Sequence, residues 1–345
     1  MFHPLKMNFM NNRMAHFSYK DDFKSIFSPY ILRFLEMKEA SGSNIRNLLP
    51  PLREFDRFVS ATNLTSTCLT QTDIMMWRAC ITGKKATTIY GKICIIGQFC
   101  RYLVKLGIPC HVPVYPRKPK RLYVPYIFSK EELSHIFNAA DELLLVRRDF
   151  SSLIFSIPAL LRLLYSTGMR IGEAILLKNR DVDIISRIIV LRDTKNKRER
   201  QIPIGETLFQ VLDQYMIKRN KLPIPDVNNP NSPFFISLNG KPLGGKTVRY
   251  WFLLILKQCH INYVPGVGPR IHDLRHTFAV HALDKLVKEG SDIYCCLPIL
   301  SVALGHKCVS DTEYYLRITN QVYPDLSEVT SAIAEYIFPT INIMP

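Results

Sequence analysis

Several features of secreted and membrane proteins are missing from this sequence of 345 residues. No apolar run approaches the roughly 18 residues that a membrane-spanning helix needs. The first twenty residues mix Met and Phe with Asn, Lys and Arg, and so lack the continuous apolar core of a secretory leader. No internal repeat is visible. These absences predict a soluble, cytoplasmic protein without a membrane partner.

Paired cysteines are also missing. The nine cysteines are an odd number, scattered without a C-x-x-C spacing or a histidine pair at zinc-finger spacing. The vicinal pair Cys295-Cys296 lies in an apolar setting. We therefore expect free thiols in a reducing compartment.

Acidic residues are few beside basic ones. The chain has 29 Asp and Glu against 45 Lys and Arg, a formal net charge of +16 and a pI of about 9.4. A chain this basic most often binds a polyanion, usually nucleic acid, and a well-solvated basic surface is the alternative. Because 47% of the residues are hydrophobic, the chain can bury a core in two domains or in one large domain.

The first third of the chain is helical in pattern. Residues 1–22 show no clear period and are interpreted as an N-terminal arm. Over 23–108, four stretches have apolar residues at helical spacing, and Gly107 is placed to end the last helix. We expect an independent helical bundle. Its surface cations would contact a DNA backbone: Lys84, Lys85, Lys92, Arg101 and Lys105.

Residues 109–126 hold five prolines and four basic residues. Proline stiffens a chain and removes backbone donors, so an extended linker is predicted. The linker is either a spacer or a segment that lies along DNA. In the second case its cations contact phosphates: Arg117, Lys118, Lys120 and Arg121.

A second domain is expected over 127–325. Ser129 and Glu132 have capping-box spacing, helical patterns follow, and "MRIGEAILLK" opens a further helix. The period then changes to two, so that 188–191 and 201–204 are predicted strands of a hairpin with a cationic turn. Helices return over 206–220, 245–259 and 272–288. The predicted fold class is mainly α with a small antiparallel β-sheet (α+β).

Basic and titratable side chains recur in this domain at fixed spacings. Arg170 follows a break at Gly168, and Glu173 is placed three residues on to orient its guanidinium. One helix face carries three more such residues: His272, Arg275 and His276. Taken singly, such arginine pairs and helix histidines are usually structural. Their ordered combination points to a functional site.

The combination resembles the tyrosine recombinase (phage integrase) family. "YSTGMRIGEAILLKNRDVD" and "HDLRHTFAVHAL" look like its two signature boxes, followed by "LGH" ending at His306 and by a tyrosine. The resemblance covers about 127–320. The region 23–108 resembles the family's helical, SAM-like core-binding domain by pattern and position only, and 127–325 would be the catalytic domain.

The resemblance implies a role for each residue. Arg170 and Arg275 would neutralise the scissile phosphate, and His272 and His306 would add hydrogen bonds to it. Tyr315 would attack phosphorus and form a 3′-phosphotyrosine. The covalent link conserves the bond energy, and arginine and lysine supply the positive charge. Neither ATP, a metal ion nor another cofactor is therefore expected.

Three of the implied roles are less sharply defined. The family's spacing from "LGH" reaches Tyr315, and Tyr314 is one residue short of it. Glu173 is interpreted as support for Arg170. His276 either aids the site or braces Asp273.

The family uses a lysine in the hairpin turn as general acid for the leaving 5′-oxygen. Alignment through "RERQIPI" places Lys195 there, with Lys197 as the fallback. The alternative is a solvated cationic turn, including Arg198, that contacts backbone phosphates.

The expected function is site-specific recombination of duplex DNA with paired sites by a homo- or hetero-tetramer. The chain would be the integrase or transposase of a mobile element, or an Xer-like dimer-resolving recombinase. A relaxing enzyme similar to type IB topoisomerases shares the chemistry but works as a monomer, and a non-catalytic DNA-binding module would have lost part of the residue set. The tail 326–345 carries a short apolar stripe that packs within the chain or docks on a neighbouring protomer.

Overall fold

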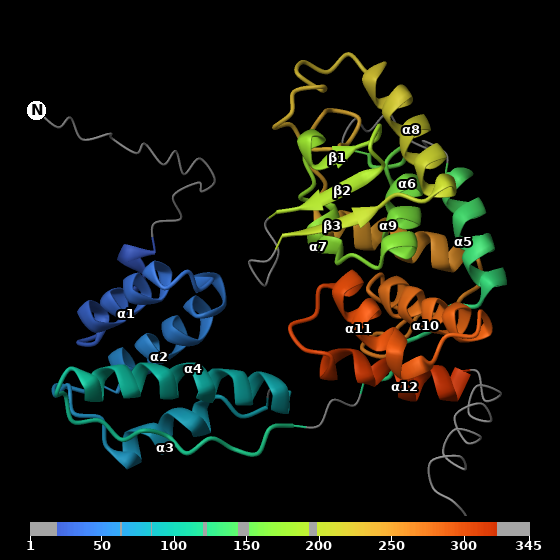
Figure 1. Ribbon diagram of the computed structural model, residues 1–345. Helices are drawn as coiled ribbons and strands as arrows, with labels where there is room; N and C mark the ends of the chain where they lie inside the picture. Colours follow the sequence, from blue (N-terminus) through green and yellow to red (C-terminus); the bar gives the residue numbers. More distant parts are fainter. Residues whose placement is uncertain are drawn as a thin grey trace, which may run out of the picture. The chain divides into compact units, whose positions relative to one another are not determined.

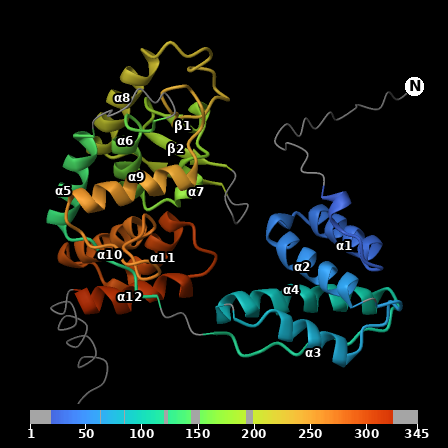
Figure 2. The same ribbon diagram turned by 180° about the vertical axis from the view of Figure 1, so that it is seen from behind.

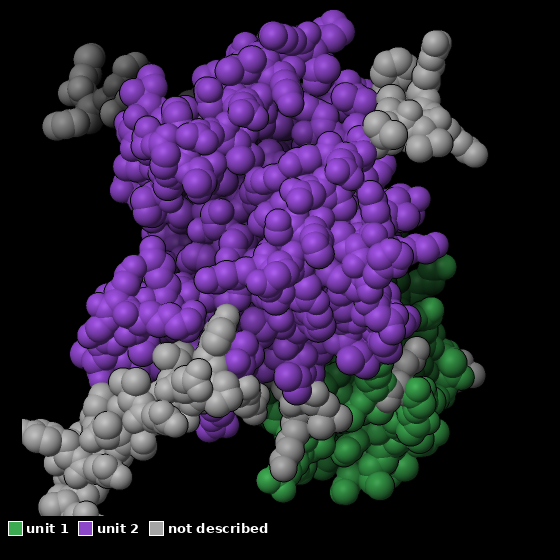
Figure 3. All heavy atoms as spheres, turned by 90° about the vertical axis from the view of Figure 1, so that its right-hand side faces the viewer, with its two compact units in different colours: residues 1–122 green, residues 123–345 purple. Residues whose placement is uncertain are grey.

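The computed structural model describes residues 19–62, 64–83, 85–119, 123–143, 152–192 and 199–322. The chain divides into two compact units, residues 1–122 and 123–345, which Figure 3 shows in different colours. The described residues are mostly helical, with one three-stranded antiparallel sheet, which confirms the predicted fold class. None of the described helices is long and apolar enough to cross a membrane.

The described part of the first unit is built from helices (Figure 1). They are α1 (Ser28–Ala40), α2 (Leu49–Ala61), α3 (Gln71–Cys80) and α4 (Ala86–Lys105), with 3-10 turns at Lys20–Asp22 and Ile45–Asn47. The core is aromatic: the ring of Phe55 lies 5.8 Å from Trp77 and 6.2 Å from both Phe27 and Phe99. Such tilted and edge-on ring pairs stabilise beyond their buried area. Prolines in the first turn of α2 need no intrahelical N–H partner, which explains why that helix begins there.

The described part of the proline-rich stretch after α4 packs onto the rest of the first unit. His111 N–H donates to Leu69 O at 2.7 Å. Farther along, the Tyr115 ring lies under the guanidinium of Arg101 at 4.8 Å. A Cβ at Gly97 would lie only 2.6 Å from the Tyr115 ring, so the absence of a side chain there admits the tyrosine. Residues 111–119 have no regular secondary structure.

The second unit holds the sheet and the remaining helices (Figure 1). The helices are α5 (Lys130–Asp141), α6 (Ile157–Thr167), α7 (Ile171–Ala174), α8 (Glu206–Asn220), α9 (Gly245–Gln258), α10 (Asp273–Lys288), α11 (Ile293–Leu304) and α12 (Ser310–Val322). The strands are β1 (Val182–Asp183), β2 (Ile188–Leu191) and β3 (Arg200–Pro203), preceded by a 3-10 turn at Asn179–Asp181. The predicted hairpin is confirmed, and the short β1 was not predicted.

The hairpin places β3 in a fixed register on β2. Leu191 pairs with Arg200, and Ile189 pairs with Ile202. Because side chains alternate along a strand, Arg200 and Ile202 share the face that turns toward the core. The register therefore carries an arginine side chain inward, to Glu173 of α7 and Gly305 after α11.

Helix α10 is central to the second unit. It packs against α6, α11 and α12, and Figures 1 and 2 show α10, α11 and α12 side by side. Its apolar residues Ala279, Val280 and Leu283 are fully buried between these helices. Its first turn thereby faces the ends of α6 and α11, where the predicted site residues lie.

Candidate active site

Arg275 joins the ends of two helices. Its Nη1 donates to Gly168 O at 2.6 Å, after the end of α6, and its Nη2 donates to Leu304 O at 2.8 Å, at the end of α11. The residue is only 3% exposed. Burial and the nearby charge of Arg170 lower its pKa to about 10, so Arg275 stays a cation at neutral pH.

Gly168 makes the turn that brings Arg170 to this place. Its φ of +60° is left-handed, and a Cβ would lie 2.3 Å from the Phe278 ring, so glycine suits both the backbone and the packing. Arg170 then caps α7. The helix expected from "MRIGEAILLK" is limited to the single turn Ile171–Ala174. A longer helix would carry the chain past the 3-10 turn that precedes β1.

Glu173 holds Arg170 as predicted. Its carboxylate accepts from Arg170 N at 3.0 Å and from Arg170 Nη1 at 2.9 Å. Burial opposes ionisation of Glu173, but the hydrogen bonds from Arg170 and the charge of Arg200 outweigh it, and its pKa is lowered. The carboxylate is therefore ionised at neutral pH and orients the guanidinium.

Arg200 is a site residue that the sequence reasoning missed. Its Nη2 donates to Glu173 Oε2 at 2.8 Å, and both side chains are at most 10% exposed. Its guanidinium also lies against Gly305, where a Cβ would come within 2.2 Å of Nη1. Arg200 shares a strand face with buried Ile202, and a cation on a buried face requires a partner. That alternation was the available signal.

His306 follows the glycine that ends α11. Gly305 has a left-handed φ of +65°, and His306 N–H then donates to Ser301 O. The His306 Nδ1 lies 2.7 Å from Thr312 Oγ1 on α12. Burial and the charges of Arg275 and Arg170 lower the pKa of His306 to about 4. The ring is neutral at physiological pH.

His272 is the N-cap residue of α10, three residues before Arg275. Crowding by protein atoms and the charges of Arg275 and Arg170 lower its pKa to about 4. The residue is nevertheless exposed. The two guanidinium charges thus act on a ring that solvent also reaches, and they disfavour its protonation.

The two adjacent tyrosines of α12 differ sharply in exposure. Tyr315 is 3% exposed, and its ring lies parallel to that of His306 at 6.2 Å. Burial raises the pKa of Tyr315, and the charge and hydrogen bonding of Arg275 oppose that rise. Tyr314 is 41% exposed, and its hydroxyl lies 3.5 Å from Tyr123 O. The structure brings Tyr315, not Tyr314, to the arginines and histidines.

His276 points to Tyr315. Its Nδ1 lies 3.0 Å from Tyr315 Oη. The alternative role, bracing Asp273, is not seen. The Asp273 carboxylate accepts instead from Tyr123 Oη at 2.6 Å and from Arg270 N at 2.7 Å.

Some predicted contacts fall elsewhere. Lys195, Lys197 and Arg198 lie outside the described residues, as do Lys84, Lys120 and Arg121 and the tail 326–345. Five of the predicted DNA contacts are described and exposed: Lys85, Arg101, Lys105, Arg117 and Lys118. The predicted surface position of Lys92 was wrong, because this lysine is only 12% exposed and pairs with Glu54 of α2.

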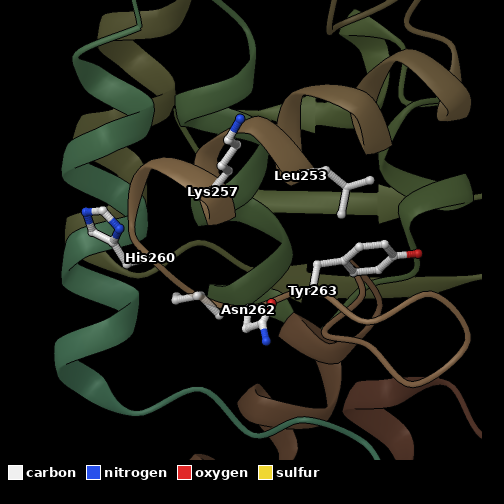
Figure 4. Close-up of a pocket in the computed structure, with 6 residues that line it drawn as sticks. Leu253, Lys257, His260, Asn262 and Tyr263 are labelled. Atoms are coloured by element: carbon white, nitrogen blue, oxygen red, sulfur yellow. The ribbon is translucent and has the colours of Figure 1, made fainter.

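A separate hollow of about 470 Å³ lies at the end of α9 (Figure 4). It is lined by Leu253, Lys257, His260, Ile261, Asn262 and Tyr263. None of its lining residues is a predicted catalytic residue, so among the described residues the catalytic cluster lies elsewhere. Among the described residues, no cluster of histidine, cysteine and carboxylate side chains has an arrangement that could hold a metal ion.

Buried arginines, neutral histidines and a buried tyrosine, gathered by a mainly helical unit, define a site suited to an anionic ester. The model of the phage integrase family matches residues 127–321, more than half of the chain. The chain therefore belongs to the phage integrase family, the tyrosine recombinases.

Known relatives agree with this membership. The protein y4rB of Sinorhizobium fredii, named as an integrase/recombinase, is 27% identical over 296 residues, which cover 85% of this chain and 93% of the relative. Tyrosine recombinase XerC of Staphylococcus saprophyticus is 26% identical over 304 residues, covering 86% and 94%. The crystal structure of XerH bound to its difH substrate shares the fold, with a TM-score of 0.58 and 19% identity over 81% of this chain and 79% of that one.

Proposed function

We propose that this protein is a site-specific DNA recombinase that cuts and rejoins duplex DNA through a 3′-phosphotyrosine on Tyr315. The observation that carries the proposal is the position of Tyr315, which is buried against Arg275, His276 and His306. The nucleophile is thereby set among cations and neutral donors that suit a phosphodiester.

The charges of the site match that substrate. The Glu173 carboxylate pairs with Arg170 and Arg200, and Arg275 adds a third guanidinium whose contacts are backbone carbonyls. The excess positive charge would neutralise the two non-bridging oxygens as the phosphorane-like transition state forms. His272 and His306 are neutral and can donate to the same phosphate through a ring N–H.

The proton for the leaving 5′-oxygen is assigned to Lys195 of the hairpin turn, with Lys197 as the alternative. The chemistry needs no ATP, since phosphotyrosine conserves the bond energy, and the arginines supply charge that a metal ion would otherwise bring. Lys85, Arg117 and Lys118 are exposed and would contact backbone phosphates beyond the site.

We assign the chain to a mobile element, as its integrase or transposase, acting on paired sites as a tetramer on DNA. An Xer-like resolving recombinase is the second candidate, because the similarity to XerC extends over 94% of that relative. Recombination of a plasmid that carries two sites from the element ends distinguishes these two assignments. Recombination between element ends supports the first assignment, and recombination confined to a chromosomal dimer-resolution site supports the second.

The chemistry itself is tested with a nicked duplex that traps the covalent intermediate. Genomic fragments selected by binding supply the site, and the reaction contains EDTA and no nucleotide. Wild type is expected to form an SDS-resistant, protease-sensitive adduct. Tyr315→Phe should abolish the adduct while DNA binding persists.

Tyr314→Phe is the matched control, since it removes the neighbouring hydroxyl from the same helix. It should form the adduct at nearly the wild-type rate. Loss of the adduct only in Tyr314→Phe would contradict the assignment of the nucleophile. Site-independent relaxation of a supercoiled plasmid, without recombinant products, would favour a topoisomerase-like activity instead.

A further inference from the structure

His276 contacts the atom of Tyr315 that would react. Its Nδ1 is 3.0 Å from Tyr315 Oη, and the ring centroids are 5.6 Å apart. The contact joins α10 and α12, which pack against each other. We propose that His276 is a further catalytic residue, which accepts the phenol proton of Tyr315 as the phenol oxygen attacks phosphorus. This role rests on the proposed function and adds the proton acceptor to it.

The donors around the phenol decide the direction of this hydrogen bond. An arginine side chain has N–H donors and no acceptor. Arg275 acts on the Tyr315 phenol by charge and by hydrogen bonding, both of which favour the phenolate form. The proton of the phenol itself therefore needs another acceptor. A neutral His276 with its proton on Nε2 offers the Nδ1 lone pair for that purpose.

No hydrogen bond to the Tyr315 hydroxyl is found for the other two histidines, His272 and His306, in the described part of the chain. His306 uses Nδ1 to contact Thr312 Oγ1, and its ring lies parallel to that of Tyr315. The charges of Arg275 and Arg170, the two cations proposed to hold the phosphate, act on His272. We therefore place His272 and His306 on the phosphate side and His276 on the nucleophile side.

The surroundings of His276 keep it neutral and ready to accept. Burial, together with His272, Arg275 and His306, lowers its pKa to about 3. These groups and the Tyr315 hydroxyl are the titratable or charged groups found to act on its ring in the described residues. A base this weak does not ionise a phenol in advance. Transfer accompanies attack, because the phenol becomes acidic as its oxygen bonds to phosphorus and the phosphate charge favours the imidazolium.

The step balances in both directions. In cleavage the Oη–P bond forms, the P–O5′ bond breaks, the phenol proton passes to His276 Nδ1, and the 5′-oxygen takes a proton from the general acid. In rejoining the 5′-hydroxyl attacks phosphorus, the Oη–P bond breaks, and His276 returns its proton to Tyr315. The cationic neighbours of His276 favour that return.

The test compares two histidines of α10, each of which contacts a tyrosine of another helix. His281 of α10 lies 3.0 Å, through Nδ1, from the hydroxyl of Tyr165, and it is away from the reacting residues. His276→Asn and His281→Asn each replace a ring that contacts a tyrosine. Single-turnover adduct formation on the nicked duplex is measured for both variants and for wild type between pH 6 and 9. Thermal unfolding and DNA binding serve as checks on folding.

We expect His276→Asn to slow adduct formation about 100-fold, with a rate that rises steadily with pH as free phenolate becomes more abundant. A fluorinated tyrosine at 315, which ionises more easily, should shrink that defect. His281→Asn should react like wild type. A His276→Asn rate within about threefold of wild type would overturn the assignment while leaving the proposed function intact.

A second measurement is independent of the reaction. Nitrogen NMR of the DNA-free protein, labelled in histidine, should show His276 with its proton on Nε2. The His276 signal is assigned by its absence from the spectrum of His276→Asn, or of His276→Gln if the first variant folds poorly. A proton on Nδ1 would contradict the proposal. Absence of any adduct with wild type on its own site would instead refute the proposed function, and the role of His276 with it.

Discussion

Replacing Arg200 with methionine tests whether this arginine stabilises the site through its contact with Glu173. In wild type the Arg200 guanidinium holds Glu173 Oε2 at 2.8 Å, and Arg170 holds the other carboxylate oxygen at 2.9 Å. Methionine fills similar space without charge. Glu173 then loses one of two cations and is free to turn fully toward Arg170.

The contacts set the expected size of the effect. Removing one partner of a buried ion pair costs about 3–5 kcal/mol, and a single hydrogen bond to a charged group contributes about 1.5–3 kcal/mol. Because Glu173 keeps Arg170, we expect the lower figure, a loss of about 1.5–3 kcal/mol in the free energy of unfolding. A similar loss of charge stabilisation in the transition state corresponds to cleavage about tenfold to hundredfold slower.

Arg187→Met is the matched control. Arg187 pairs with Glu206 at 2.7 Å, but these side chains are 45% and 58% exposed. Exposed pairs contribute about 0–1 kcal/mol, so this variant should lose little stability and no cleavage rate. Urea unfolding and the nicked-duplex assay are run on both variants. Equal effects of the two substitutions would show that Arg200 does not support the site.

Three other features of the chain can be tested: the site histidines, the turn at Gly168 and the cations of the proline-rich stretch. The folded pKa values of the site histidines lie below their ordinary 6.5, so the stabilisation is full above pH 6.5 and is lost as pH falls toward 4. The free energy of unfolding should fall by up to about 1.4 kcal/mol per pH unit for each of the two less exposed rings. Urea unfolding across that range should show this slope, and a flat profile would contradict the prediction. Gly168→Ala should cost about 2–4 kcal/mol from left-handed backbone and overpacking against Phe278, whereas Gly172→Ala, which meets no atom within 4 Å, should not destabilise in a thermal melt. Neutralising Arg117 and Lys118 should weaken DNA binding and reduce its salt slope by about 2, and an unchanged slope in titrations at several salt concentrations would remove these residues from the interface.

The elements that the sequence predicted best have local causes. The capping box at Ser129 and Glu132 starts α5 as expected, because its two hydrogen bonds span only three residues. The helix over 272–288 and the hairpin follow from periods of 3.6 and two. The short α7 departs from expectation because the pattern in "MRIGEAILLK" continues past the point where the chain must turn toward β1.

The site was predictable as a set of residues but not as a set of contacts. Arg170 and Glu173 are three residues apart, so their pairing could be predicted from spacing. Arg200 is 27 residues from Glu173, and His276 is 39 from Tyr315. The first contact depends on strand register and the second on how α12 packs across α10. Strand alternation indicates that Arg200 needs a buried partner, but no local pattern identifies the partner in either arrangement.

The burial of Arg275 has a physical explanation that bears on substrate binding. A buried cation is costly unless it is paired, yet among the described residues the contacts found for the Arg275 guanidinium include no carboxylate ion pair. Its partners Gly168 O and Leu304 O lie at the C-terminal ends of α6 and α11, where helix dipoles place partial negative charge. These partial charges hold the guanidinium without cancelling its charge. A phosphodiester would complete the neutralisation, so DNA binding should also stabilise the fold of the catalytic unit.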